Sequence, residues 1–348
     1  IRDLKGIEHF TALTELYCYR NQLTALDVSS NTALTYLSCG GNRLTALDVS
    51  SNTELTSLYC YSNQLTALDV SKNTALTNLW CGDNRLTALD VSKNTALTDL
   101  SCGGNRLTAL DVSSNTALTR LYCNDNQLAA LDVSSNTALT TLSCSSNRLT
   151  ALDVSENTAL TSLYCDSNQL TALDVSSNTA LTDLRCGSNR LTALDVSSNT
   201  ALTTLSCDDN KYTISPADDG TFDLSTLPGS FDMSKASDWV GGSVSGNTLT
   251  IDKGVTEVTY KYDCGKNNSV KFTLLLLQPS GDVNGDGILD AKDLLYMRRY
   301  VADVPVGIEL DMTAADMDGD GEVTPADCLL LRKTLAGVID VKAIDKRV

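Results

Sequence analysis

Residues 34–54 read LTYLSCGGNRLTALDVSSNTE, and residues 55–75 read LTSLYCYSNQLTALDVSKNTA. The second segment copies the first with few changes, so the chain repeats itself every 21 residues. An internal repeat of this length decides the architecture before any other feature does. The period is marked by cysteines spaced 21 residues apart, at Cys18, Cys39, Cys60, Cys81, Cys102, Cys123, Cys144, Cys165, Cys186 and Cys207.

Each repeat begins with a short alternation of apolar and polar residues. Leu37 and Cys39 alternate with Tyr36, Ser38 and Gly40, which is the period of a β-strand. One repeat cannot bury its leucines alone, but stacked repeats share a continuous core. The second half of the repeat, L-T-A-L-D-V-S, alternates as well. We therefore expect extended segments on both faces of each coil, with little helix.

The pattern L-x-x-L-x-C-x-x-N-x-L resembles the leucine-rich repeat, in a bacterial form of 21 residues with cysteine in the third leucine position. The resemblance implies a mainly β solenoid, which we assign to residues 1–213 as ten repeats. Two asparagine rows, Asn21 to Asn210 and Asn31 to Asn199, are expected to turn inward and bond backbone groups of the loops. The cysteines are expected to be reduced core residues, because parallel neighbours are poorly aimed for disulfides.

The outward strand positions form the concave face of a leucine-rich repeat protein, and here several of them are aromatic. Such residues are typical of interfaces, although tyrosine is also a good strand residue that steadies a sheet. The ligand could be a protein or a polysaccharide, and the flat surface without a cluster of carboxamides favours a protein. The predicted ligand face consists of Tyr17, Tyr59, Trp80, Tyr122 and Tyr164.

Residues 214–278 break the repeat and carry turn clusters between alternating segments. Leu249 and Ile251 belong to one such segment, and Val270 and Phe272 to another. This pattern predicts a small β-sandwich. We expect it to cover the end of the solenoid, which would otherwise expose leucines and strand edges.

Two segments, 282–293 and 316–327, place oxygen-bearing side chains at positions 1, 3, 5 and 12 around a glycine at position 6. Calcium takes six to eight oxygen ligands, and alternate loop residues can direct them at one centre. The pattern predicts two Ca²⁺ ions, with the carbonyls of position 7 as further ligands. The predicted ligands are Asp282, Asn284, Asp286, Ile288 and Asp293 in the first loop, and Asp316, Asp318, Asp320, Glu322 and Asp327 in the second.

Each loop precedes an apolar run that predicts a helix, and position 12 is Asp rather than the Glu of an EF-hand. No entering helix is expected before the first loop, because the preceding segment is strand-like and breaks at Pro279. A duplicated loop-then-helix pair of this kind resembles a type I dockerin of bacterial cellulosomes. We assign residues 279–348 to this α-helical two-calcium module.

The resemblance implies a secreted, cellulosome-associated protein that binds the cohesin domain of a scaffolding protein. Positions 10 and 11 of the loops depart from the clostridial pattern and are more similar to ruminococcal modules. The expected cohesin contacts are Ala291, Lys292, Leu295, Arg298 and Arg299, with a solvated helix face as the alternative for the two arginines.

Composition excludes several other functions. The formal net charge is −17, so no basic face is expected that could bind nucleic acid. No apolar run is long enough to span a membrane. The chain has a single histidine, His9, which disfavours the common hydrolytic mechanisms. It begins at Ile1 within a repeat, which we interpret as a processed or trimmed form.

These observations predict a non-catalytic cellulosome component that displays a leucine-rich repeat surface, with a protein as the favoured ligand. The alternative is a carbohydrate-binding or adhesion module that uses the aromatic stripe.

Overall fold

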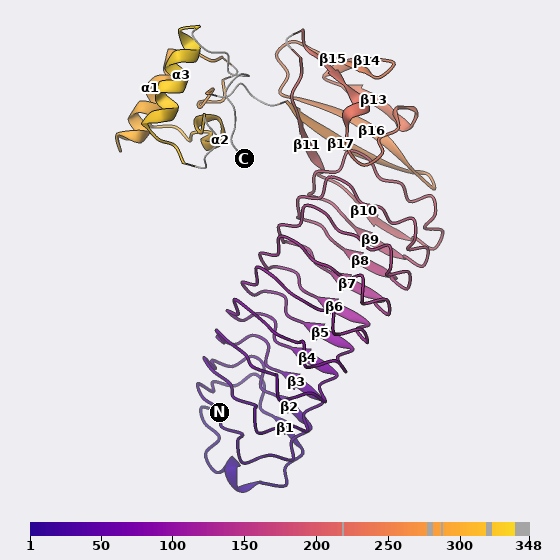
Figure 1. Cartoon of the computed structure of the whole chain (residues 1–348), viewed down its shortest axis with the longest axis vertical. Coiled ribbons are helices and arrows are strands. Elements are labelled where there is room, and N and C mark those ends of the chain that lie inside the picture. The colour runs from indigo at the N-terminus through magenta and orange to yellow at the C-terminus, as the bar shows by residue number, and fades with distance from the viewer. Residues whose placement is uncertain (218, 277–280, 287, 318–321, 338–348) are drawn as a thin grey trace.

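The computed structural model describes residues 1–217, 219–276, 281–286, 288–317 and 322–337. Figure 1 shows a rod of stacked coils, two small sheets at the end of the rod, and a helical module that follows them in the chain. A 3₁₀ turn, Ile7–His9, precedes the first strand.

Each coil of the rod contributes one strand of three residues to a single parallel sheet (Figure 1). The strands pair in chain order and in register, so that Leu37 lies opposite Leu16 and Leu58. The register follows from the 21-residue period, because paired residues of neighbouring strands are 21 positions apart in the sequence. The ten strands are β1 (Glu15–Tyr17), β2 (Tyr36–Ser38), β3 (Ser57–Tyr59), β4 (Asn78–Trp80), β5 (Asp99–Ser101), β6 (Arg120–Tyr122), β7 (Thr141–Ser143), β8 (Ser162–Tyr164), β9 (Asp183–Arg185) and β10 (Thr204–Ser206).

The core of the rod consists of columns of identical residues. In one coil Leu97, Leu100, Cys102, Leu107 and Val112 are fully buried, and the neighbouring coils repeat the arrangement. Each buried leucine or valine contributes about 1.5–3 kcal/mol relative to an exposed one. Because every column continues through the rod, the solenoid has one continuous core.

The first asparagine row joins each coil to the previous one, as predicted. Asn105 donates its side-chain amide to the carbonyls of Cys81 and Cys102, at 3.1 and 2.9 Å. Its side-chain oxygen accepts the backbone N–H of Leu86 at 3.0 Å. The buried carboxamide therefore satisfies three backbone groups that no strand pairing reaches.

The second asparagine row also turns inward, but it uses only its amide. Asn115 donates to the carbonyls of Val91 and Asn94, at 3.0 and 2.8 Å. Its buried Oδ1 accepts no hydrogen bond from the residues that the structure describes. The two rows thus differ in the number of backbone groups that they satisfy.

The second half of each repeat forms no strand among the described residues. Extended segments were expected on both faces of each coil, but a β-sheet is present on one face only. The chain turns there instead. The Asp111 carboxylate accepts the backbone N–H of Ser113 at 2.9 Å and its hydroxyl at 2.7 Å. Asn115 then donates its backbone N–H to the Val112 carbonyl. Local bonds of this kind compete with strand pairing.

All twelve cysteines are free, as expected, and only Cys328 is not buried. Burial raises the pKa of the Cys102 thiol, and that of Cys264, to about 12. The thiols therefore remain protonated at neutral pH and act as small apolar core residues.

Two sheets follow the rod. One has four strands in the order β11-β17-β16-β13, and the other has three in the order β12-β15-β14. Apolar side chains of both sheets belong to the same core as the solenoid leucines. The strands are β11 (Lys211–Ile214), β12 (Thr221–Asp223), β13 (Ala236–Val240), β14 (Gly242–Ser245), β15 (Thr248–Ile251), β16 (Glu257–Gly265) and β17 (Asn268–Leu276), with 3₁₀ turns at Leu224–Thr226 and Met233–Lys235.

Polar contacts fix these sheets to the last complete coil. The Lys266 ammonium donates to the carbonyls of Asn199, Thr200 and Leu202, at 3.0, 2.9 and 3.2 Å. Lys235 pairs with Asp195 at 2.8 Å. The end of the solenoid is therefore covered, and three of its last carbonyls are bonded to Lys266.

The remaining elements in the described part of the chain are three helices, α1 (Ala291–Val301), α2 (Met312–Ala315) and α3 (Pro325–Leu335). They have a small core of their own, in which Val283, Met297, Ala315, Met317 and Leu331 are fully buried. None of the helices in the described residues is long and apolar enough to cross a membrane.

Replacement of Asn105 by alanine should destabilise the rod more than replacement of Asn115. Asn105→Ala removes three hydrogen bonds and leaves the Leu86 N–H without its partner, whereas Asn115→Ala removes two bonds to carbonyls that each keep another donor. We expect losses of about 3 and about 2 kcal/mol. Urea unfolding followed by circular dichroism measures both, with exposed Thr108→Ala as the control. Equal unfolding midpoints for Asn105→Ala and the control would contradict a stabilising role of the first asparagine row.

Alkylation should reveal the burial of the thiols. Native protein treated with iodoacetamide at mildly alkaline pH should gain at most one adduct, on Cys328, because the other thiols are buried and protonated. Unfolded protein should gain twelve, one for each cysteine. Intact-mass spectrometry counts the adducts. Several adducts on the native protein would show that the repeat cysteines are accessible to the reagent and would contradict their burial.

Candidate calcium and recognition sites

Asp293, at position 12 of the first predicted loop, ties the loop to the helix that follows. Its side chain is fully buried. One carboxylate oxygen accepts the backbone N–H of Val283 at 3.0 Å, and the other accepts that of Asp290 at 2.8 Å. Asp290 in turn caps α1 by accepting the N–H of Lys292. Asp293 thus closes the loop, and together with Asp290 it forms the capping box at the start of α1.

The second predicted loop repeats this arrangement 34 residues later. Asp327 is fully buried and accepts the backbone N–H groups of Met317 and Thr324, at 2.8 and 2.7 Å. Thr324 caps α3, and Pro325 occupies its first turn. The duplication seen in the sequence is therefore a duplication of structure. Asp318 and Asp320 lie outside the described residues.

The other side-chain oxygens of the first loop hold its backbone. Asp282 accepts the N–H of Gly285 at 3.0 Å, Asn284 accepts that of Asp286 at 2.8 Å, and Asp286 accepts that of Ile288 at 3.0 Å. Asp282 is fully buried, although it carries a carboxylate. Positions 1, 3 and 5 therefore accept hydrogen bonds from backbone groups within the turn of the loop.

The donor set of the first loop fits calcium. It offers only hard oxygens, and two of its carboxylates, on Asp282 and Asp293, are withdrawn from water. Burial raises the pKa of the Asp293 carboxyl above its ordinary value, which a cation beside it would counteract. Within the described ranges, no three Asp, Glu, His or Cys side chains gather in a group that could hold a metal ion. The ligand set, including the Ile288 and Glu322 carbonyls, stays a prediction.

Four of the five predicted docking residues are exposed on α1, namely Ala291, Lys292, Leu295 and Arg298, whereas Arg299 is half-buried. Leu295 is 54% exposed, which is unusual for a leucine with a core nearby. The structure adds α3 to this surface. A groove of ≈ 400 Å³ between the two helices is lined by Arg298, Val301, Ala302, Pro325, Cys328, Leu329 and Arg332.

Sequence reasoning missed the contribution of α3. Leu329 and Arg332 occupy the same places in the second half as Leu295 and Arg298 in the first, 34 residues earlier. Leu329 is 50% exposed, nearly as much as Leu295. The spacing of the two loops carried this signal, since it predicts the equivalent positions on the second helix.

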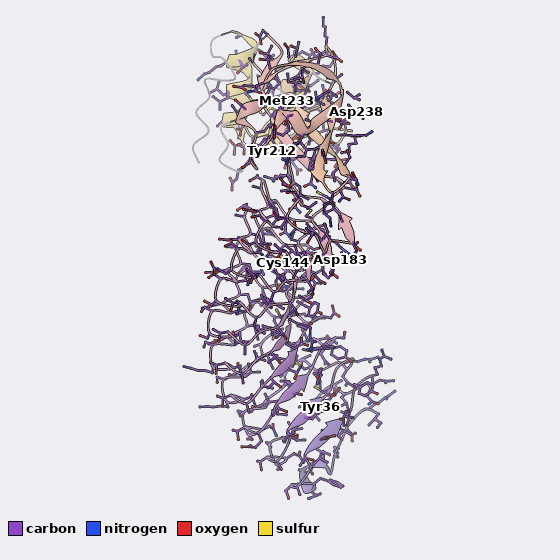
Figure 2. All side chains as sticks on the ribbon, turned by 90° about the vertical axis from the view of Figure 1, so that its right-hand side faces the viewer. Tyr36, Cys144, Asp183, Tyr212, Met233 and Asp238 are labelled. Atoms are coloured by element: carbon purple, nitrogen blue, oxygen red, sulfur yellow. The ribbon has the colours of Figure 1, made fainter. Side chains whose placement is uncertain are left out.

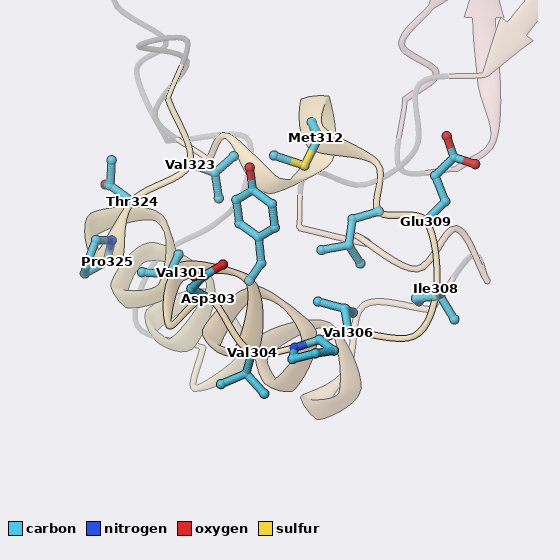
Figure 3. A pocket seen from close by; sticks show the side chains of 13 residues that line it. Val301, Asp303, Val304, Val306, Ile308, Glu309, Met312, Val323, Thr324 and Pro325 are labelled. Carbon is cyan, nitrogen blue, oxygen red and sulfur yellow. The ribbon is translucent and has the colours of Figure 1, made fainter.

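A larger depression lies beside the segment that joins α1 to α2 (Figure 3). Its volume is ≈ 970 Å³, and Val304, Val306, Ile308 and Met312 supply apolar side chains. Tyr300 lines it from the end of α1, and Pro325 from the start of α3. The sequence did not predict this depression.

The five residues of the predicted ligand face all lie on the outward side of the sheet, but they do not form one cluster. Tyr17 and Tyr59 are linked through Tyr36, with ring centroids 4.7 and 5.2 Å apart. Tyr59 also contacts Trp80 at 5.2 Å. Among the described residues, Tyr122 and Tyr164 take no part in this run. Figure 2 labels Tyr36 and Asp183, which lie towards opposite ends of this face.

Aspartates with aromatic and arginine partners mark the rest of the face. Asp99 is almost fully buried and accepts the indole N–H of Trp80 at 3.2 Å and the Arg120 guanidinium at 2.7 Å. Farther along, Tyr164 donates its hydroxyl to Asp183 at 3.0 Å, and Arg185 lies over the Tyr164 ring at 4.9 Å. Of these residues, sequence reasoning placed Trp80 and Tyr164 on the ligand face, and it predicted none of the pairings.

Comparisons with known proteins agree with this geometry. The functional domain of InlJ from Listeria monocytogenes, described as including a cysteine ladder, shares 30% identity over 79% of this chain and 88% of that one, with a TM-score of 0.45. A leucine-rich repeat protein from Leptospira interrogans shares 25% identity and a TM-score of 0.56. The match covers 59% of this chain and 57% of that protein's length. An internalin, inlF, from Listeria monocytogenes has a TM-score of 0.51 at 22% identity, covering 59% of this chain and 70% of that one.

The solenoid is thus that of a leucine-rich repeat protein. Residues 280–336 match the family model of the Dockerin type I domain. The chain is therefore a leucine-rich repeat protein that carries a type I dockerin domain after the repeats. A search of curated proteins finds no match.

Calcium should bind both loops and stabilise the helical module. We expect isothermal titration calorimetry to give two ions per chain. Asp293→Asn keeps one of the two acceptor oxygens, replaces the other by an NH2 group and removes a charged ligand, so it should weaken one site at least about tenfold. Asp327→Asn should weaken the other. Exposed Glu309→Ala, in the same module, serves as the control, and unchanged binding in both Asn variants would refute the assignment.

Proposed function

We propose that this protein is a secreted, non-catalytic component of a cellulosome-type assembly, attached through its dockerin to the cohesin domain of a scaffolding protein. The match of residues 280–336 to the type I dockerin family carries this proposal. The two capped loop-and-helix halves, each closed by a buried aspartate, support it. Two calcium ions would hold the loops and thereby fix α1 and α3 against each other. We also propose that the dockerin is of the ruminococcal kind, because positions 10 and 11 of its loops depart from the clostridial pattern.

The cohesin would contact the solvent face of α1 and α3. The exposed leucines, Leu295 and Leu329, would provide apolar contacts, and Arg298 and Arg332 line the groove between α1 and α3. Arginines at the edge of an apolar contact are typical of protein interfaces. We include Ala291 and Lys292 in this surface because both are exposed beside Leu295. Arg299 is included as a half-buried residue at its edge.

The solenoid would then present its strand face, which is the outward side of the sheet β1 to β10, to a protein partner, while the sheets formed by β11 to β17 connect the two functions. We propose that the chain divides into three domains: the solenoid of residues 1–213, the connecting β module of residues 214–278 and the dockerin of residues 279–348. The Lys266 contacts and the shared core support a firm junction between the first two parts. A carbohydrate ligand on the aromatic residues is the alternative.

Cohesin binding should require calcium and the exposed leucines. In a panel of immobilised type I cohesins, we expect at least one to bind the chain, and EDTA to abolish the binding. Leu295→Ala combined with Leu329→Ala should weaken the binding at least about tenfold. Trp80→Ala, on the solenoid, should leave it unchanged. Binding that persists in EDTA, or a panel in which no cohesin binds, would refute the docking function.

A further inference from the structure

Aromatic side chains gather on the first four coils of the strand face. We define the aromatic patch as Tyr17, Tyr36, Tyr59, Tyr61 and Trp80, which ring contacts connect without a gap. Tyr17 is 56% exposed and Trp80 is 38% exposed, so the patch faces solvent.

The rings of the patch are turned towards one another. Tyr17, Tyr36 and Tyr59 have centroids 4.7 and 5.2 Å apart, with interplanar angles of 30° and 37°. At these separations and angles the rings are tilted against each other, so each ring covers part of its neighbour's face. A sugar ring needs an open aromatic face to stack on, so this arrangement disfavours a glycan and favours a polypeptide.

The far end of the patch is held in place by the buried Asp99. The indole N–H of Trp80 donates to it, and so does Arg120, whose guanidinium is half-exposed. The polar atom of Trp80 is thus already used, and the exposed part of the ring is hydrocarbon. Tryptophan and arginine fixed in this way lose little conformational freedom when a partner binds.

A glycine on the neighbouring coil makes room for the patch. A Cβ atom on Gly40 would lie 2.7 Å from the Tyr61 ring. The residue at this position therefore decides where the Tyr61 ring lies. It offers a way to disturb the patch without deleting an aromatic residue.

The opposite end of the strand face is acidic. On the last three coils, the outward positions carry Asp166, Asp183 and Asp208 against one cation, Arg185. The first four coils carry one charge at the same positions, Glu15, which accepts a bond from the Tyr17 hydroxyl. A partner that lies along the whole face would match it with an apolar end and a basic end.

We propose that the strand face binds a polypeptide segment that places an apolar side chain against Trp80 and Tyr61 and directs basic residues towards β8 to β10. This inference rests on the proposed function of protein recognition and deepens it. The unbroken run of ring contacts, the fixed Trp80–Asp99–Arg120 group and the acidic far end carry it together.

Trp80 is a built-in reporter for this test, because Trp239 is the only other tryptophan of the chain. The Trp239 indole N–H makes no hydrogen bond within the described residues, so Trp239→Phe removes no such contact. Phage-displayed random peptides selected on the Trp239→Phe chain should be enriched in sequences with an apolar residue followed by lysine or arginine. A synthetic selected peptide should shift the Trp80 emission to shorter wavelength, and its affinity should fall with added salt.

Variants then locate the contact. Trp80→Ala should weaken the peptide at least about tenfold, and Gly40→Ala should weaken it about threefold by displacing the Tyr61 ring. Thr108→Ala, exposed in the second half of its repeat and outside the strands, should have no effect. Selected peptides that bind Trp80→Ala equally well, or a selection that enriches none, would overturn the inference.

Cellohexaose and xylohexaose serve as the glycan probes. Neither should shift the Trp80 emission, and a shift with either one would assign the face to sugars and overturn the inference. Cohesin binding by the same variants is measured in parallel. Intact cohesin binding together with a failed peptide test would refute only the assignment of the strand face, whereas lost cohesin binding would refute the docking function.

Discussion

The solenoid depends on one kind of contact, the buried asparagine that joins consecutive coils. A leucine column supplies most of the free energy, but it does not by itself fix where one coil lies on the next. Asn105 does so, because its carboxamide reaches the backbone of its own coil and of the one before it. Every later feature uses this spacing. The ring contacts between Tyr36 and Tyr59, and the bond from Trp80 to Asp99, join neighbouring coils.

The helical module solves a related problem with a different residue. Asp293 and Asp327 are fully buried and accept backbone N–H groups from both ends of their loops. In the rod a neutral carboxamide is sufficient, because both donors and acceptors must be satisfied. In the loops the carboxylates accept from backbone N–H groups and, at Asp327, also from the Thr324 hydroxyl, so they can bond these donors and still contribute negative charge for a cation. The choice between Asn and Asp thus follows from what each buried site must satisfy.

Sequence reasoning predicted the repeat, the parallel strands, the free cysteines, the asparagine rows and the two loop-and-helix halves. These features have a fixed spacing, and spacing is what a sequence displays directly. It could not predict which outward residues touch, because Tyr36 and Tyr59 occupy different positions of their strands and meet diagonally. It also missed Leu329 and Arg332, although the 34-residue offset of the loops pointed to them. The second half-repeat looked like a strand because aspartate–serine turns preserve the same alternation.

The uniformity of the coils has a consequence for how such a molecule varies over generations. Adjacent repeats are nearly identical in sequence, which invites unequal recombination within the gene. Each coil contacts only its neighbours, so gain or loss of one coil leaves the junction at Lys266 and the dockerin untouched. A single event of this kind between β5 and β10 would move the aromatic patch by about 4.8 Å relative to that junction. The reach of the strand face can therefore change in discrete steps without any new fold.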